Sequence, residues 1–174
     1  LNGSGKGSIK TGIPFFDHML SQTIKHGFLD AEIKAKGDLD VDQHHTVEDV
    51  GIALGQALKK ALAGSKNIAR YGNGVAPMDE ALVQAVIDLG GRGFYKSTLD
   101  IREPRLKGLE SSLIEEFFRA FAMNAGAALH LRVMDGKNGH HVAEGAFKAL
   151  GLALRQAVAP ESRYRGAAST KGRA

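Results

Sequence analysis

Apolar and polar positions alternate along several segments of the chain with the period of a β-strand. Residues 29–36 alternate apolar and charged side chains without interruption, which is typical of a strand with one buried and one solvated face. Residues 129–133 alternate in the same way, and residues 81–88 and 94–101 are also predicted to be strands. A shorter strand is expected at residues 8–11.

Four other segments place apolar residues three or four positions apart, which is the spacing of an amphipathic helix. The predicted helices span about residues 14–26, 46–63, 113–124 and 140–158. Pro14 suits the start of the first helix, and the helix dipole stabilises the carboxylate of Asp17 in its first turn. Gly27 and Gly64 are predicted to end the first and second helices.

Glycine-rich segments between these elements predict loops and turns. A loop is expected around Gly72 and Gly74, a tight turn at residues 90–93 and a connection at residues 106–112. Residues 1–7 are turn-rich and predict a hairpin whose first strand would precede them.

One motif occurs twice, at the start of the second helix and at the start of the last. Residues 44–48 read His-His-Thr-Val-Glu, and residues 140–144 read His-His-Val-Ala-Glu. When the two copies are aligned, nine of the nineteen residues from 44 to 62 are identical to those from 140 to 158. The repeat therefore preserves chemistry as well as apolar spacing.

This duplication predicts an α+β fold made of two homologous half-domains in one compact unit. The halves are expected to cover residues 1–90 and 91–174, with mixed or antiparallel sheets and with helices packed on one face. A repeat of about 96 residues is too long for a solenoid and suits a duplicated half-domain.

The repeated motif has the residue types and spacing of a metal site. Neighbouring residues on a helix point about 100° apart, whereas residues four apart share a face. His44 therefore faces Glu48, and His140 faces Glu144, while each adjacent histidine pair is predicted to divide between two ions. Such ligands without thiolate suit manganese, iron or zinc. A single histidine pair at a helix start is more often a cap or surface feature, and the duplication favours metal.

Three further side chains are candidate ligands. His18 precedes His44 by 26 residues, and Glu116 precedes His140 by 24, so a carboxylate can replace an imidazole in the second half. His130 is the rival of Glu116, although it is expected on the polar face of a strand.

Composition excludes some functions and leaves the type of partner open. The chain contains no cysteine, which rules out disulfides, thiolate ligands and cysteine nucleophiles. No apolar run approaches the roughly 20 residues of a membrane span, and no signal peptide is visible, so a cytoplasmic location without membrane partners is expected. The net charge of +4 permits nucleic acid or a small anionic substrate.

Several polar side chains are candidates for binding a phosphate group. They are Arg70, Arg92, Ser169 and Lys171. Cations beside glycines and a Ser-Thr-Lys-Gly segment supply the donors that a phosphate needs. Taken singly, each of these side chains is better explained as a solvated surface group.

Six motifs in order along the chain carry a resemblance to a known family. They are Phe15-Phe16-Asp17-His18-Met19-Leu20, His44-His45-Thr46-Val47-Glu48-Asp49, Met78-Asp79-Glu80-Ala81, Phe117-Phe118-Arg119-Ala120, His140-His141 with Glu144, and Ser169-Thr170-Lys171-Gly172. Together they resemble the imidazoleglycerol-phosphate dehydratases of histidine biosynthesis over essentially the whole chain.

The resemblance implies a fold, an assembly and a reaction. It implies ββαβα-like halves similar to ribosomal protein S5 domain 2, in a shell of 24 subunits with two Mn²⁺ ions per active site at subunit interfaces. It implies conversion of imidazole glycerol phosphate to imidazole acetol phosphate and water, with no nucleic-acid partner. The substrate phosphate would lie against Arg70, Arg92, Ser169 and Lys171. By this resemblance the chain is expected to lack the family's first strand, which carries a substrate-contacting Glu, and Glu116 stands where many members have His.

Two metals offer a route around the low acidity of the carbon-bound proton. The hypothesis is that each ion binds one nitrogen of the substrate ring, held as imidazolate, which expels the neighbouring hydroxyl. One ion is predicted on His18, His45, His140 and Glu144, and the other on His44, Glu48, Glu116 and His141. The residues assigned to catalysis are His45, Glu48, His141 and Glu144, and His44 is also assigned to substrate binding.

Two other functions use the same residues. A dinuclear metallohydrolase would release phosphate and form no ketone. A metal-dependent nucleic-acid-binding protein would explain the basic C-terminal segment and would bind in a salt-sensitive way without turnover. Neither explains the order of the motifs along the whole chain.

Overall fold

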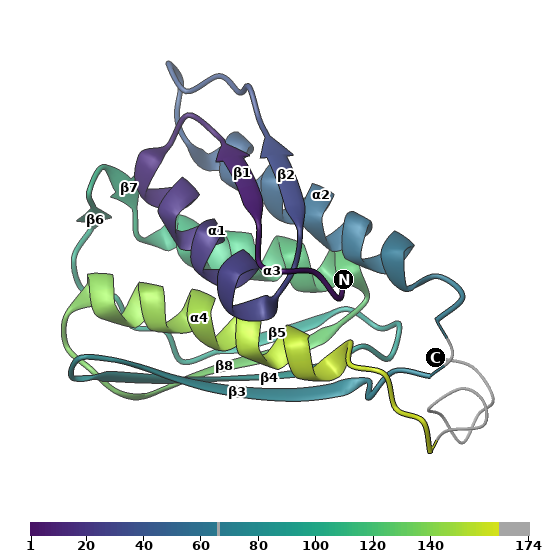
Figure 1. Ribbon diagram of the computed structural model, residues 1–174. Helices are drawn as coiled ribbons and strands as arrows, with labels where there is room; N and C mark the ends of the chain where they lie inside the picture. The colour runs from purple at the N-terminus through teal and green to yellow at the C-terminus, as the bar shows by residue number, and fades with distance from the viewer. Residues whose placement is uncertain (66, 164–174) are drawn as a thin grey trace.

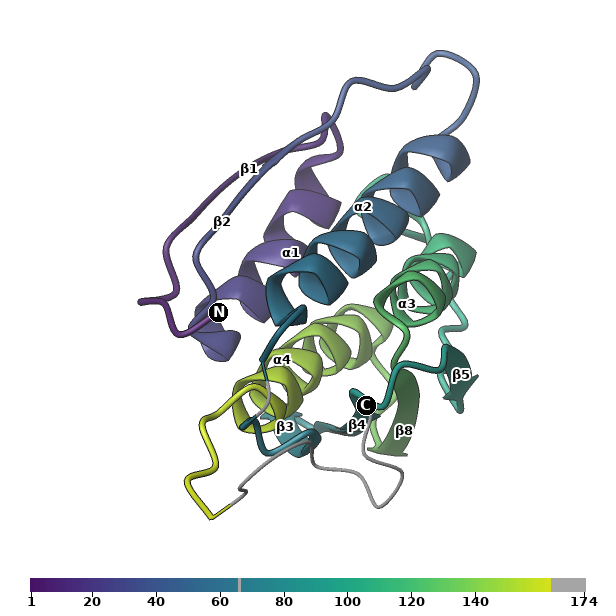
Figure 2. The same cartoon turned by 90° about the vertical axis from the view of Figure 1, so that its right-hand side faces the viewer.

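The computed structural model describes residues 1–65 and 67–163 and arranges their helices in two layers between two sheets (Figure 1). The elements are β1 (Gly7–Lys10), α1 (Pro14–Gly27), β2 (Ala31–Lys34), α2 (His44–Leu62), β3 (Tyr71–Met78), β4 (Ala81–Asp88), β5 (Phe94–Ser97), β6 (Arg105–Leu106), β7 (Leu109–Glu110), α3 (Ser112–Ala125), β8 (Ala128–Asp135) and α4 (Gly139–Ala157). Figure 2 shows α1 and α2 beside the small sheet, and α3 and α4 against the larger one.

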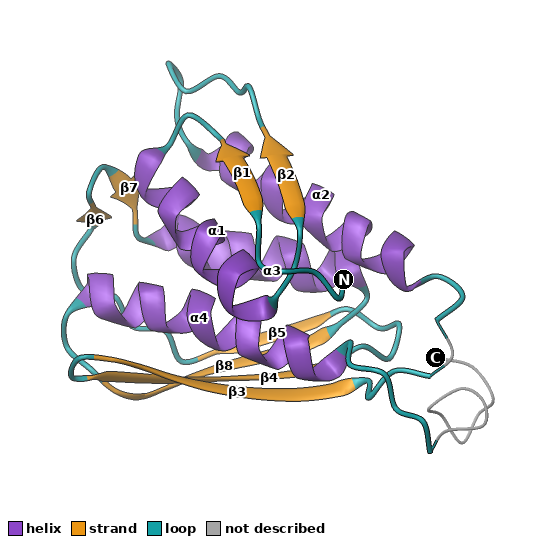
Figure 3. Cartoon of the chain, in the orientation of Figure 1, coloured by secondary structure: helices purple, strands orange, loops and turns teal. Residues whose placement is uncertain are grey.

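The two main sheets differ in size and are coloured orange in Figure 3. The small sheet pairs β1 with β2 in parallel. The larger sheet has the order β3-β4-β8-β5, in which β4 is antiparallel to both its neighbours and β5 is parallel to β8. Strands β6 and β7 form a separate short hairpin.

The element order confirms the predicted internally duplicated α+β fold. In the first half, α1 connects the parallel strands β1 and β2, and α2 follows. In the second half, α3 precedes β8, which pairs in parallel with β5, and α4 follows. Helices α1 and α3 have 14 residues each, and α2 and α4 have 19 each. The division after residue 90 stays a prediction; β3 and β4 hydrogen bond within the sheet that contains β8.

The loop prediction around Gly72 and Gly74 was wrong, because these residues lie in β3. The inward-facing positions of this strand are Gly72, Gly74 and Ala76, all buried, so the strand shows no apolar alternation in the sequence. The small residues are needed because α4 packs directly on the strand. A Cβ at Gly74 would stand 2.2 Å from the carbonyl oxygen of Ala149 on α4.

Two connections and one helix end also differ from the predictions. Residues 90–93 connect β4 to β5 through a bend and not through a tight turn, since β8 lies between these two strands. The predicted connection at residues 106–112 contains parts of the β6–β7 hairpin. Helix α1 includes Gly27, and the left-handed residue that follows is Phe28, with φ of 47°. Gly27 packs closely instead, because a Cβ there would stand 3.3 Å from the carbonyl oxygen of Gly151 on α4.

Aromatic side chains from three helices hold the centre of the molecule together. Phe16 of α1, Phe117 of α3 and Phe147 of α4 are at most 1% exposed. The rings of Phe117 and Phe147 stack at 5.2 Å, and the ring of Phe16 meets that of Phe117 edge-on at 5.3 Å. Such pairs add about 0.5–1.5 kcal/mol each beyond the burial of apolar area. This packing places the first turns of α1 against α4, where the candidate site lies.

Candidate metal centre

The N-terminus of α4 carries the second copy of the repeated motif and is held by several acceptors. The side chain of Asn138 accepts hydrogen bonds from the backbone N–H groups of His140 and His141, which satisfies two helix donors. Glu103 Oε1 accepts from the backbone N–H of Gly139 at 3.1 Å. Glu80 Oε1 accepts from the N–H of Asn138 at 3.0 Å. Three side chains therefore hold the backbone at the start of the helix that carries the histidines.

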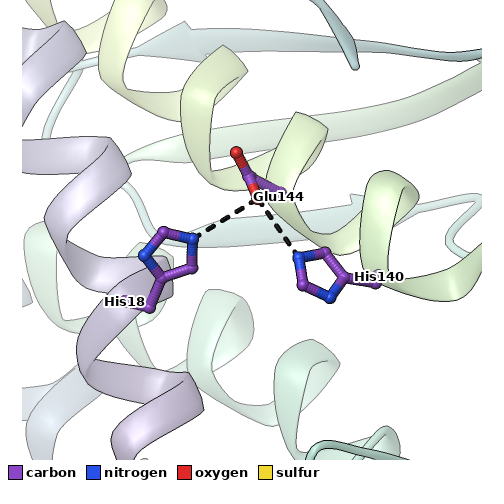
Figure 4. Close-up of side chains that lie close together, drawn as sticks. All are labelled: His18, His140 and Glu144. Atoms are coloured by element: carbon purple, nitrogen blue, oxygen red, sulfur yellow. Dashed lines mark hydrogen bonds and ion pairs between the residues drawn. The ribbon is translucent and has the colours of Figure 1, made fainter. Parts of the chain in front are cut away.

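Figure 4 shows His18, from α1, and His140, from α4, directed at the carboxylate of Glu144. The Oε2 atom of Glu144 lies 3.5 Å from Nε2 of His18 and 3.3 Å from Nε2 of His140. The three ligand atoms all lie within 4.8 Å of one another. Phe15 supports the arrangement, because its ring meets the His140 ring edge-on at 5.1 Å.

Lys148 completes the surroundings of Glu144. Its Nζ lies 2.7 Å from Glu144 Oε1, one turn along α4, and donates to the sulfur of Met78 at 3.3 Å. Burial raises the pKa of Glu144. The hydrogen bond and charge of Lys148, with a smaller effect of His18, lower this pKa by more than burial raises it, so the net shift is downward. Glu144 is therefore a buried carboxylate that stays ionised and can bind a cation.

The first copy of the motif lies apart from this cluster. On α2, His44 Nε2 lies 4.0 Å from Glu48 Oε2, as the four-residue spacing predicts. His45 Nδ1 lies 3.0 Å from Asp38 Oδ2, in the segment that precedes the helix. This hydrogen bond raises the pKa of His45 and lowers that of Asp38. The predicted ligand His45 therefore does not join His18, His140 and Glu144 within this chain.

The two remaining predicted ligands also lie outside the cluster. His141 Nδ1 lies 2.7 Å from Glu80 Oε2, and this hydrogen bond raises the pKa of His141 and lowers that of Glu80 to about 2. Glu116 Oε2 accepts from Arg119 at 2.5 Å on α3. Within residues 1–65 and 67–163, His18, His140 and Glu144 are the single group of three or more side chains placed to hold a metal.

His130 is placed on the other side of the large sheet. It is exposed on β8, between the buried Leu129 and Leu131, and its ring lies 5.5 Å from that of Phe94. Since α4 covers the buried face of this sheet, His130 faces away from the cluster.

The predicted phosphate-binding residues are only partly described. Arg70 is held by Asp88, with Nε 2.7 Å from Oδ1 and Nη2 3.1 Å from Oδ2, and its guanidinium lies 4.9 Å from the centre of the Tyr71 ring. Arg92 is exposed, in the segment between β4 and β5. Ser169 and Lys171 lie outside the described residues.

Sequence reasoning missed three residues that surround the histidines: Lys148, Glu80 and Asp38. Two signals could have found them. Lys148 follows Glu144 by four residues, the spacing of a helical ion pair. Glu80 lies in the Met-Asp-Glu-Ala motif, to which no role was assigned. Asp38 carries no such signal, because only the folded loop brings it to His45.

A family model described as imidazoleglycerol-phosphate dehydratase matches residues 11–154. The chain belongs to the imidazoleglycerol-phosphate dehydratase family. Its members are hydro-lyases, and this chain is accordingly a lyase of histidine biosynthesis. The relative from Moorella thermoacetica is 53% identical over 172 residues, which are 99% of this chain and 88% of that protein. The relative from Desulforamulus reducens is 51% identical over 172 residues, which are again 99% of this chain and 88% of that protein. Both are named as the dehydratase.

Solved structures of the family share the fold. The crystal structure of the dehydratase from Staphylococcus aureus has a TM-score of 0.86 at 35% identity and covers 92% of this chain and 91% of its own. The structure of the dehydratase from Pyrococcus furiosus has a TM-score of 0.83 at 36% identity. The match covers 97% of this chain and 91% of that chain. No helix among the described residues is long and apolar enough to cross a membrane.

Proposed function

We propose that the chain converts imidazole glycerol phosphate to imidazole acetol phosphate and water, using two Mn²⁺ ions per active site. The observation that carries this proposal is the convergence of His18, His140 and Glu144 from two helices. Family membership supports a dehydratase of histidine biosynthesis. Such a step is consistent with a cytoplasmic location, since it acts on a charged phosphorylated intermediate.

The side chains of the cluster fit a divalent cation. Two imidazole nitrogens and one carboxylate oxygen within 4.8 Å form a nitrogen and oxygen donor set without thiolate, which suits manganese, iron or zinc. The carboxylate is ionised and largely buried, so it supplies a negative charge where water competes least. When bound, the ions would supply Lewis acidity that stabilises the substrate imidazole as its anion.

The chain's own residues would bind and orient the substrate. The phosphate group would be held by Arg92, with Arg70, Ser169 and Lys171 as the further predicted contacts. Holding this remote group would supply binding energy and orientation away from the reacting bonds. The carboxylate of Asp88 holds the guanidinium of Arg70 in place. Arg70 would therefore have to contact the phosphate and Asp88 at the same time.

A complete site needs two copies of the repeated motif, and we infer that they come from different subunits. Within one chain, His45 is bound to Asp38 and stands outside the cluster that contains His140. A second subunit that presents the start of α2 to the cluster would supply the missing ligands. The proposed assembly is a closed shell of 24 subunits with the sites at its interfaces.

Removal of metal tests the proposed reaction. We expect a strong chelator to abolish formation of the ketone product from imidazole glycerol phosphate, and added Mn²⁺ to restore it. The reason is that the proposed reaction needs the Lewis acidity of the ions to stabilise the substrate imidazole as its anion. The assay follows the ketone and free phosphate in the same samples. Phosphate release without a ketone would replace the proposal with a metallohydrolase, and turnover that survives chelation would remove the metal from the mechanism.

Replacement of Arg92 tests the phosphate contact. We expect Arg92→Ala to lower kcat/KM by about 10- to 100-fold, mainly through KM, since a hydrogen bond to a charged group contributes about 1.5–3 kcal/mol. The matched control is Arg102→Ala, because Arg102 is also an exposed arginine of the second half, with 86% of its side chain accessible. Equal kinetics of the two variants would exclude Arg92 from the phosphate site.

A further inference from the structure

The second histidine of each motif copy contacts a carboxylate through the same ring atom. His45 Nδ1 lies 3.0 Å from Asp38 Oδ2, and His141 Nδ1 lies 2.7 Å from Glu80 Oε2. The two carboxylates occupy unrelated places: Asp38 precedes α2, and Glu80 lies in the turn between β3 and β4. The internal duplication does not by itself relate them, so the shared geometry arises twice from different parts of the chain.

The first histidines use the opposite ring atom. His44 and His140 approach their carboxylates, Glu48 and Glu144, through Nε2. Each motif copy therefore has one histidine whose Nε2 meets a carboxylate of its own helix and one whose Nδ1 is held by a carboxylate from another segment. Nε2 of His141 also lies 3.7 Å from Oδ2 of Asp79, which is longer than a hydrogen bond.

An ionised carboxylate can only accept hydrogen bonds, so the Nδ1 atom that it contacts must carry the proton. The lone pair of a neutral ring then resides on Nε2, which is the atom available to a metal. Both carboxylates are ionised at neutral pH, because the ordinary pKa of an aspartate or glutamate side chain is about 4. In metal sites such a partner fixes the ring orientation and raises the basicity of the ligand.

We propose that Asp38 and Glu80 are positioning residues that hold His45 and His141 in the Nδ1–H form, so that each ring presents Nε2 to a metal ion. This inference rests on the proposed function in one respect, namely that the two histidines are metal ligands. The carboxylates do not touch the substrate or the ion; they act through the imidazole rings.

Glu80 has a second role that must be separated from the first. Its Oε1 accepts from the backbone N–H groups of Lys137 and Asn138, so it also supports the start of α4. Among the described residues, Glu103 supports the same helix start through the N–H of Gly139 and makes no hydrogen bond to a histidine ring. Glu103→Gln therefore controls for loss of backbone support.

Asp38 has its own control in the same loop. Asp40 is an exposed aspartate two residues further along, so Asp40→Asn removes an equal charge from the segment before α2. A comparison of Asp38→Asn with Asp40→Asn thereby separates contact with the His45 ring from loss of negative charge near the site.

The experiment compares Glu80→Gln and Asp38→Asn with these controls in the full assembly. Free Mn²⁺, detected by electron paramagnetic resonance, gives the affinity. Copper-substituted protein gives, by electron spin echo modulation, the quadrupole coupling of the remote imidazole nitrogen, which responds to its hydrogen-bond acceptor. We expect the two variants to bind Mn²⁺ about 10- to 100-fold more weakly and to show an altered remote-nitrogen coupling. Asp40→Asn should match the wild type in both measurements, and Glu103→Gln should keep the wild-type coupling and lose less Mn²⁺ affinity than Glu80→Gln.

Each departure from this pattern has a distinct meaning. Wild-type affinity and unchanged coupling in Glu80→Gln and Asp38→Asn would overturn the proposal. Equal losses in Glu80→Gln and Glu103→Gln, with unchanged coupling, would also overturn it for Glu80 and leave support of the helix. If the wild type bound no Mn²⁺ while the copper coupling still responded to the two variants, the metal assignment in the proposed function would fail and the positioning of the rings would stand.

Discussion

Glu144→Gln is expected to lower kcat/KM by on the order of 10³-fold and to weaken Mn²⁺ binding in parallel, since loss of one preorganised electrostatic contact costs about 10²- to 10³-fold. The carboxylate is the shared partner of His18 and His140, at 3.5 and 3.3 Å. The amide keeps the shape and removes the charge. Lys148, 2.7 Å from the other oxygen, would then place an uncompensated positive charge beside the site and repel the cation.

The measurement is steady-state kinetics together with Mn²⁺ titration of the assembled protein. The control is Glu32→Gln, because Glu32 is a carboxylate with 63% of its side chain exposed, on the small sheet. The control variant should keep wild-type activity and affinity. Full activity of Glu144→Gln would show that the cluster is not the metal centre, whereas a lost fold, seen by circular dichroism, would call for the same test on His18→Ala.

Local spacing made half of the candidate site predictable from the sequence. The contacts of His44 with Glu48 and of His140 with Glu144 follow from the helical period alone. The distance between the starts of α2 and α4 does not follow from the helical period, because it depends on how the four helices pack. The proposed grouping of His45 with His140 therefore stays a prediction about neighbouring subunits.

The fold could be predicted from the sequence where the buried side chains are large and apolar. The prediction failed where the buried positions carry glycine or alanine. Helix α4 was predicted because residues such as Leu150 and Leu154 recur at helical spacing and are buried. Strand β3 was missed because its buried positions are Gly72, Gly74 and Ala76, which resemble loop residues in composition. Their role depends on the backbone of α4, which packs on the strand although the contacting residues lie 75 (Gly74 to Ala149) and 81 (Gly72 to Ala153) positions further along the chain.

The close contact between β3 and α4 makes Gly72→Ala one of the most damaging single substitutions expected in this chain. A Cβ at Gly72 would stand 1.9 Å from the carbonyl oxygen of Ala153 and 3.0 Å from the backbone nitrogen of Ala157. Backbone atoms cannot turn aside as a flexible side chain can, so the helix or the strand must move. We expect a loss of about 3 kcal/mol or more, at the upper end of the cost of overpacking a core.

Thermal unfolding at a fixed protein concentration measures this loss, because the stability of an assembly depends on concentration. The matched control is Val75→Ala on the same strand, since Val75 is 41% exposed on the opposite face. Its change should stay within about 0.5 kcal/mol, as for other surface positions. Since α4 carries His140 and Glu144, displacement of the helix by Gly72→Ala should also weaken Mn²⁺ binding, whereas Val75→Ala should leave it unchanged. An unaltered midpoint for Gly72→Ala would mean that the strand and helix can separate without cost, and the packing that fixes the metal centre would then lie elsewhere.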